Sequence, residues 1–138
     1  MTSGTFRFLG FELEWRPLRR GTLVSTVAVL ILGVGVGTFV DEDSNLSLVV
    51  TALITVAFIA GGVVAGVYAT SNHVAHGMLT AVPVAAVAVV VQLIRRIAND
   101  DAAPWLSLVF IMFLATSLGT LGGVIGSRFS PTRRSLLQ

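Results

Sequence analysis

The sequence predicts an all-α membrane protein with four transmembrane helices, arranged as two antiparallel helical hairpins. Four apolar stretches, at about residues 22–40, 46–69, 74–94 and 104–127, take up most of the 138 residues. None of these stretches contains Asp, Glu, Lys or Arg. Each is close to the ~20 residues with which a helix crosses a hydrocarbon core about 30 Å thick. The chain should therefore cross a membrane several times.

The connections between the stretches are short. Residues 70–73 join the second stretch to the third, and so short a link requires a tight antiparallel helical hairpin. The chain outside the spans is too short to bury a core of its own. We therefore expect one domain, in three parts: a cytoplasmic interfacial segment at 1–21, a four-helix transmembrane domain at 22–127 and a basic cytoplasmic tail at 128–138.

The distribution of Arg predicts the orientation. Four Arg precede the first stretch and three follow the fourth, whereas two, Arg95 and Arg96, lie in the third connection. The first connection, residues 41–45, has only acidic charges. Because Arg and Lys accumulate in cytoplasmic loops, both termini should be cytoplasmic in a multi-pass protein of the cell membrane. The first stretch is followed by no A-x-A site, so we expect a signal-anchor helix instead of a cleaved signal peptide.

The N-terminal segment mixes aromatic and charged residues. Its side chains alternate between apolar and charged from Phe11 to Arg16, as in a strand, but on a helix Phe8, Phe11, Trp15 and Leu18 would share one face. In either form the segment should lie at the cytoplasmic membrane interface, as an anchor or, alternatively, as a docking patch for another protein. The residues predicted at the membrane interface are Trp15, Arg16, Arg19, Arg20 and Arg128.

The third stretch contains Pro83, which removes one backbone hydrogen bond and predicts a kink near residues 79–83. We interpret the kink as static, with a moving hinge as the alternative. Either Thr80 or a neighbouring helix should satisfy the carbonyl that the proline frees.

Small residues recur at four-residue spacing in the second and fourth stretches, and such stripes let helix backbones approach closely in a membrane. The second and fourth helices are therefore predicted to be the central packed pair. The matching stripes are also compatible with a parallel tandem repeat of two hairpins, although composition alone produces similar glycine-rich helices. The predicted helix-packing residues are Gly33, Gly37, Ala57, Gly61, Gly62, Ala65, Gly66, Ala69, Ala115, Gly119, Gly122, Gly123 and Gly126.

Residues suited to chemistry are few. The chain has no Cys, which excludes disulfides, zinc thiolate sites and iron–sulfur clusters. His73 and His76 share one helix face, but two ligands do not make a zinc site. We interpret them as an interfacial polar pair, or His73 as a cap of the helix start, with metal binding or pH sensing as the alternative. We predict no catalytic residue, no cofactor and no nucleic-acid partner.

Short motifs suggest a family. Trp15-Arg16 precedes the first stretch, Gly61-Gly62-Val63-Val64-Ala65-Gly66-Val67-Tyr68 closes the second, His76-Gly77 opens the third and a glycine cluster, residues 121–126, closes the fourth. Over about residues 14–127 this pattern resembles small four-helix membrane proteins of haloarchaea that are grouped as a domain of unknown function. The chain departs from that pattern at Val67 and in having few glycines after Gly77. The resemblance implies a lineage and transfers no site.

We therefore expect a non-enzymatic integral membrane protein. It should pack through the Gly and Ala stripes with itself, as a homo-oligomer, or with a membrane protein partner. The alternative is a small oligomeric channel or transporter with a pore between subunits, since four helices alone enclose little room. A charged side chain inside a span usually marks an ion path, and these four stretches have no Asp, Glu, Lys or Arg.

Overall fold

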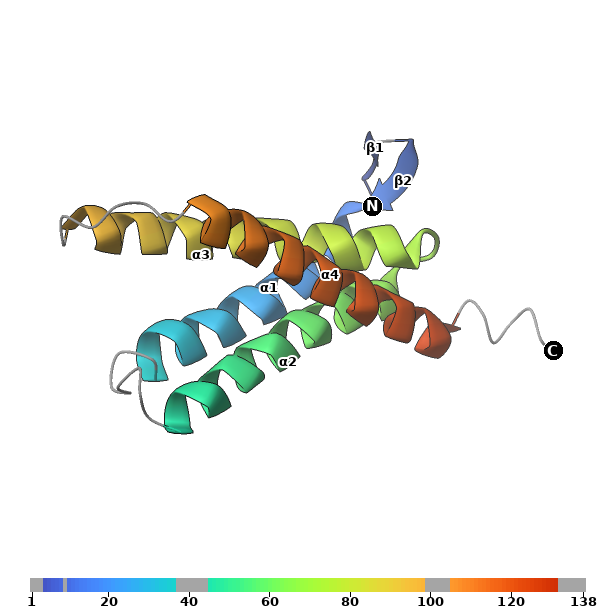
Figure 1. The fold of residues 1–138 in the computed structure, drawn as a ribbon. Coiled ribbons are helices and arrows are strands. Elements are labelled where there is room, and N and C mark those ends of the chain that lie inside the picture. Colours follow the sequence, from blue (N-terminus) through green and yellow to red (C-terminus); the bar gives the residue numbers. More distant parts are fainter. Residues whose placement is uncertain (1–3, 9, 37–44, 99–104, 132–138) are drawn as a thin grey trace.

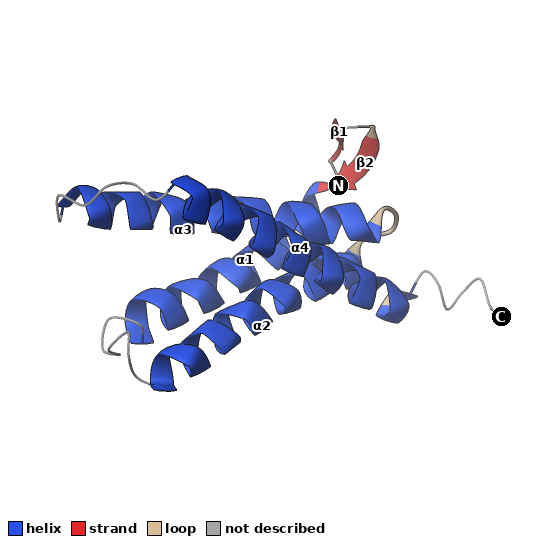
Figure 2. Ribbon diagram, viewed as in Figure 1, coloured by secondary structure: helices blue, strands red, loops and turns tan. Residues whose placement is uncertain are grey.

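The computed structural model describes residues 4–8, 10–36, 45–98 and 105–131. Within these ranges a two-stranded sheet precedes four long helices, as the ribbon in Figure 1 and its colouring by secondary structure in Figure 2 show. The elements are β1 (Thr5–Phe8), β2 (Phe11–Glu14), α1 (Trp15–Leu30), the short π-helix η1 (Ile31–Val36), α2 (Asn45–Tyr68), α3 (His73–Ala98) and α4 (Trp105–Phe129).

The N-terminal strands correct the all-α prediction. β1 and β2 pair antiparallel, with Phe8 opposite Phe11 and Phe6 opposite Leu13. Gly10, in the tight connection between them, has a φ of 83°, a conformation that glycine adopts without strain. The alternation of apolar and charged side chains therefore prevails over the helical pattern, because it lets Leu13 be buried against the bundle while the charged Arg7 and Glu12 stay exposed.

The first helix begins earlier than predicted. α1 starts at Trp15, so Arg16, Arg19 and Arg20 belong to its first two turns, while the division of the chain into three parts stays a prediction. The prediction took the charges as the end of the helix, but a long Arg side chain can leave a helix at the membrane surface and place its guanidinium in water. After Leu30 the chain continues as η1, and Gly37 lies outside the described residues.

Three described helices are long and apolar enough to cross a membrane, and they indicate a membrane protein. These are Leu48–Tyr68 within α2, the whole of α3 and the whole of α4. Only 28% to 33% of their apolar windows is buried inside the structure. Apolar surface exposed on that scale is unusual for a water-soluble monomer. The fourth crossing, by α1 and η1, stays a prediction.

Helices α1 and α2 form one pair and α3 and α4 another, and the most extensive contact among the described helices joins the pairs through α2 and α4. Figure 1 shows the pairs meeting where α2 leads into α3 and separating toward the opposite end. A cavity of about 300 Å³, lined by residues of all four helices, lies between the pairs toward that end. The apolar core is small and joins α2, α3 and α4; its buried members are Phe58, Ala81, Val84, Ala85 and Ala115.

Helix α3 runs unbroken through Pro83. The Thr80 hydroxyl donates to the carbonyl of His76 at 2.7 Å, and not to the carbonyl of Leu79 that the proline frees. A Thr hydroxyl on a helix reaches the carbonyl four residues before it, which is why Thr80 does not fill the role expected of it. The kink itself stays a prediction.

Candidate functional site

Glycines hold α2 and α4 at backbone contact. A Cβ built on Gly126 would lie 2.5 Å from the Val63 carbonyl oxygen and 3.0 Å from the Gly66 Cα. A Cβ on Gly66 would lie 2.8 Å from the Gly123 carbonyl oxygen and 3.3 Å from the Gly126 Cα. No larger residue fits either position without moving a helix. At this distance dispersion and Cα–H···O contacts between backbones hold the helices together.

The contact between α2 and α4 is reciprocal. Gly62 of α2 faces Gly122 of α4 in the same way, one helical turn before Gly66 and Gly126. In both pairs, a Cβ on either glycine would meet the backbone carbonyl of the residue three positions before the other glycine. The two helices therefore run in the same direction and are related by a local two-fold rotation. The rotation does not relate α1 to α3, because it pairs Gly61 with Leu121 whereas α3 packs on Gly119, so the tandem repeat stays a prediction.

The predicted stripes with Gly61 and Ala65 on α2, and with Gly119 and Gly123 on α4, do not face each other but face the other two helices. On α2, Gly61 and Ala65 face Gly21 of α1: a Cβ on Gly21 would lie 2.6 Å from the Gly61 carbonyl oxygen and 2.8 Å from the Ala65 Cβ. The Ser25 hydroxyl donates to the Ala57 carbonyl at 3.4 Å. Gly21 and Ser25 were missed from the sequence, although their four-residue spacing is the same small-residue signal.

On α4 the stripe faces α3. A Cβ on Gly119 would lie 2.6 Å from the Gly77 carbonyl oxygen and 2.8 Å from the Ala81 Cβ. A Cβ on Gly123 would lie 2.7 Å from the His73 carbonyl oxygen. Ala115 is buried on the same face and Ala69 is buried after the end of α2.

Gly33 does not fit the expected packing role. A Cβ built on it would meet only the Ile54 Cδ1 atom, at 3.9 Å, which is ordinary contact. Gly33 lies in η1, at the end where the two helix pairs separate, so no neighbouring backbone comes close.

The sheet docks on the bundle through a buried histidine. His76 has an exposed fraction of 0%, and its Nε2 accepts a hydrogen bond from the backbone N–H of Glu14 at 2.8 Å. Since Nε2 accepts, Nδ1 bears the hydrogen and donates to the Asn72 carbonyl at 3.1 Å. Leu13, also 0% exposed, fills the adjoining space. The sheet therefore covers His76, and the position expected for it at the membrane interface stays a prediction.

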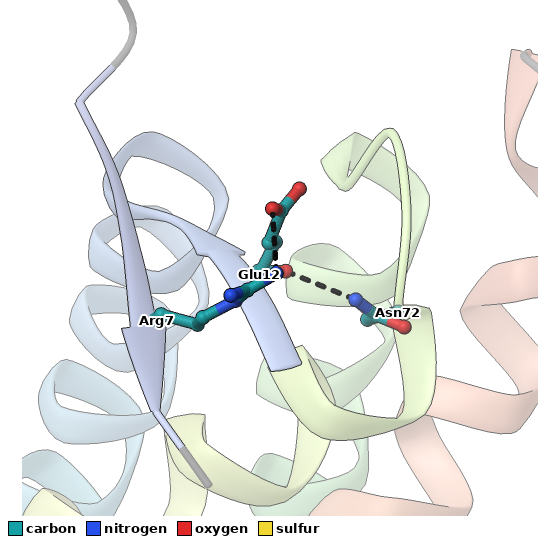
Figure 3. A network of polar contacts seen from close by, with 3 residues as sticks. All are labelled: Arg7, Glu12 and Asn72. Atoms are coloured by element: carbon teal, nitrogen blue, oxygen red, sulfur yellow. Dashed lines mark hydrogen bonds and ion pairs between the residues drawn. The ribbon is translucent and has the colours of Figure 1, made fainter. Parts of the chain in front are cut away.

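Polar groups of the turn between α2 and α3 complete the docking site. The Asn72 side-chain amide donates to the Glu12 carbonyl at 3.1 Å, and Arg7 pairs with Glu12 at 3.5 Å across the strands, as Figure 3 shows. The Glu14 carboxylate accepts hydrogen bonds from the hydroxyl and backbone N–H of Thr70. The sheet and this turn therefore lie at the same end of the bundle.

The two histidines, His73 and His76, make hydrogen bonds to different parts of the chain. His73 Nδ1 donates to the Gly66 carbonyl at 2.7 Å, near the end of α2, whereas His76 serves the sheet. Among the described residues no three His, Cys, Asp or Glu side chains gather where they could hold a metal ion.

Four of the five residues predicted at the membrane interface lie in the first two turns of α1. The rings of Trp15 and Phe6 meet edge to face with centroids 5.9 Å apart. The Arg20 guanidinium lies 4.8 Å from the centroid of the Tyr68 ring, a cation–π contact. Arg16 and Arg19 are exposed beside it, and Arg128 is exposed in the last turn of α4.

Replacing His76 with Phe is expected to loosen the sheet. Phenylalanine keeps an aromatic ring but removes the acceptor of the Glu14 N–H, and leaving a buried donor unpaired costs about 1–3 kcal/mol. Hydrogen–deuterium exchange of residues 11–14 in the solubilised protein should accelerate by about 5- to 150-fold, the equivalent of that energy. His73→Phe is the matched control, since the hydrogen bond of His73 goes to the Gly66 carbonyl in α2 and not to the sheet. Equal exchange in His76→Phe and the unmodified chain would contradict this assignment.

Comparison with known families places these features in one group. Residues 14–126 match the family described as Protein of unknown function (DUF3792). The chain belongs to this family. The matched range runs from Glu14 in β2 to Gly126 in α4, so the DUF3792 region includes the four helices and the residue that docks the sheet on His76. No significant match was found among curated proteins or among solved structures.

The match confirms the expected membership in a family of unknown function. Its bounds, 14–126, lie close to the range 14–127 over which the sequence motifs suggested a family. A haloarchaeal origin remains a prediction, and DUF3792 membership transfers no activity to any residue.

Proposed function

We propose that this DUF3792 chain is a non-enzymatic, multi-pass integral protein of the cell membrane that acts by associating with itself or with another membrane protein. The observation that supports this proposal is a face of α4 that no other described helix covers. α1 covers one side of α2, but the position on α4 that the local two-fold rotation makes equivalent is uncovered, with Ser117 and Leu121 exposed. A further helix would take that place.

The glycine stripes serve a different purpose in this proposal than in the expectation from sequence. Gly62, Gly66, Gly122 and Gly126 already contact one another inside one chain. They stabilise the bundle and are not available to a second protein. Association therefore uses the outer side of α4, where Leu121 is 53% exposed.

Three buried polar side chains, those of Ser25, His76 and Thr80, support a structural and not a catalytic role. Ser25 and Thr80 each donate to a backbone carbonyl, and both nitrogens of His76 are hydrogen-bonded. Side chains engaged in this way are held in place by the fold. The sheet lies beside the turn between α2 and α3, which supports two crossings, by α1 and by α2, between the N-terminal segment and that turn.

A Cys at position 121 tests the proposed association. The chain has no native Cys, so Leu121→Cys gives a single thiol in an otherwise silent background. In native membranes with an added oxidant, this variant should form a disulfide-linked homodimer, or an adduct with a partner that presents a Cys thiol at this face and that mass spectrometry identifies. Val90→Cys, exposed on α3, is the matched control and should react far less. A chain that stays uncrosslinked at position 121 under oxidation would exclude self-association through this face.

The cavity between the helix pairs favours a second candidate, a small channel or transporter. Its lining includes the polar side chains Thr26 and Gln92 among apolar ones. Solute or ion flux in liposomes above that of empty vesicles, abolished by Gln92→Leu, would favour transport over association alone.

A further inference from the structure

A lateral groove lies between α1 and α3. It has a volume of about 600 Å³, within the range of ~300–1,000 Å³ typical of small-molecule sites. Its walls are apolar, with Leu18, Leu23 and Val27 on α1 and Leu79 and Pro83 on α3. The aromatic pair Phe6 and Trp15 closes its end beside the sheet. In a membrane, an apolar groove between two helices is accessible to the hydrocarbon chains of lipids.

The length of the groove matches one leaflet. Its lining on α1 runs from Trp15 to Val27, which is about 18 Å at 1.5 Å per residue. Half of a hydrocarbon core is about 15 Å deep. A single lipid chain of the leaflet on the side of the sheet could enter between α1 and α3 from the bilayer and lie along the groove.

Charge identifies the headgroup. Arg19 and Leu23 line both the groove and an adjacent cavity of about 270 Å³, whose other lining residues are Arg16 and Arg20. Arg20 is held over the Tyr68 ring. Within the described part of the chain, the structure gives Arg16 and Arg19 no ion pair. Guanidinium groups bind phosphate oxygens in pairs and remain charged at any physiological pH.

We propose that this groove is a specific site for an anionic phospholipid, with one acyl chain between α1 and α3 and the phosphate on Arg16 and Arg19. The lipid comes from the leaflet at the end of the bundle where the sheet docks. The site depends on the membrane location in the proposed function, and not on association with a partner. The sheet contributes through Phe6, so an undocked sheet would open the end of the groove.

Fluorescence quenching tests the site, because Trp15 lies at the groove. Trp105→Phe leaves Trp15 as the single tryptophan of the protein. Each nanodisc would hold one protein molecule in phosphatidylcholine with a small fraction of lipid that has brominated acyl chains. Brominated phosphatidylglycerol should quench Trp15 more strongly than brominated phosphatidylcholine. Arg16→Gln and Arg19→Gln should each lower that preference about fivefold, the effect of one basic residue near an anionic surface, whereas lysine at the same positions should preserve it.

Two further variants separate the parts of the site. Thr22→Phe and Val82→Phe fill the groove and should weaken quenching by both lipids. Arg128→Gln, an exposed Arg at the end of α4, is the matched control and should leave the preference unchanged. Inorganic phosphate should not displace the lipid. Equal quenching by the two lipids, an effect of Arg128→Gln equal to that of Arg19→Gln, or displacement by phosphate alone would overturn the proposal. Since each disc holds one chain, failure of the association proposal would not alter these results.

Discussion

Replacing Gly122 with Ala is expected to destabilise the bundle by about 1–3 kcal/mol, the usual cost of overpacking. The added Cβ would meet the Ile59 carbonyl oxygen, and it would lie 2.9 Å from both the Gly62 Cα and the Val63 nitrogen. All three are backbone atoms, so no side-chain rotation can relieve the contact and the helices must separate. Reversible unfolding in mixed detergent micelles measures the change in free energy.

Gly33→Ala is the matched control for this effect. Its Cβ has space, and alanine favours helical structure over glycine by up to about 1 kcal/mol, so stability should stay level or rise slightly. Gly62→Ala should cost as much as Gly122→Ala because the contact is reciprocal. The double variant should cost less than both single changes together, since helices already moved apart accommodate the second methyl group. Full additivity would argue against direct contact of the two glycines.

Replacing Leu13 with Ala is expected to release the sheet from the bundle. Leu13 is fully buried between β2 and the helices, and truncating a buried leucine to alanine costs about 2–5 kcal/mol. The loss falls on sheet docking, because Leu13 lies outside the glycine contacts of α2 and α4. Limited proteolysis of the solubilised protein should then cleave within residues 5–14, while the helices stay protected.

Phe11→Ala is the control that tests whether the burial of a side chain, and not its size, decides how firmly the sheet is held. Phe11 lies on the same strand and is larger, but it is 49% exposed, so its truncation should leave proteolysis almost unchanged. Cleavage that accelerates equally in Phe11→Ala and Leu13→Ala would mean that the sheet is held by general hydrophobicity and not by the Leu13 contact.

The sequence predicted much of the fold. Helix α2 occupies Asn45–Tyr68 where the prediction gave 46–69, since a long uncharged apolar run has few alternatives to a helix in a membrane. The start of α1 was less predictable. Charges at Arg16, Arg19 and Arg20 resemble a helix boundary in sequence, yet a membrane helix tolerates them where its end reaches water.

The candidate sites depended on contacts between segments far apart in the chain. The sequence marked His73 and His76 as neighbours on one face, but it could not show that β2 would cover His76 and not His73. The apolar groove has the same origin, since its two walls come from α1 and α3 and its closed end from β1. No local pattern specifies such a juxtaposition.

The sequence by itself determined that the chain is apolar, helical and rich in small residues at four-residue spacing. Only the tertiary structure decided which stripe meets which helix: Gly61 faces α1, Gly62 faces α4 and Gly119 faces α3. The reason is geometric. Adjacent residues on a helix point about 100° apart, so two neighbouring glycines serve two different partners, and the choice between them depends on how all the helices pack together.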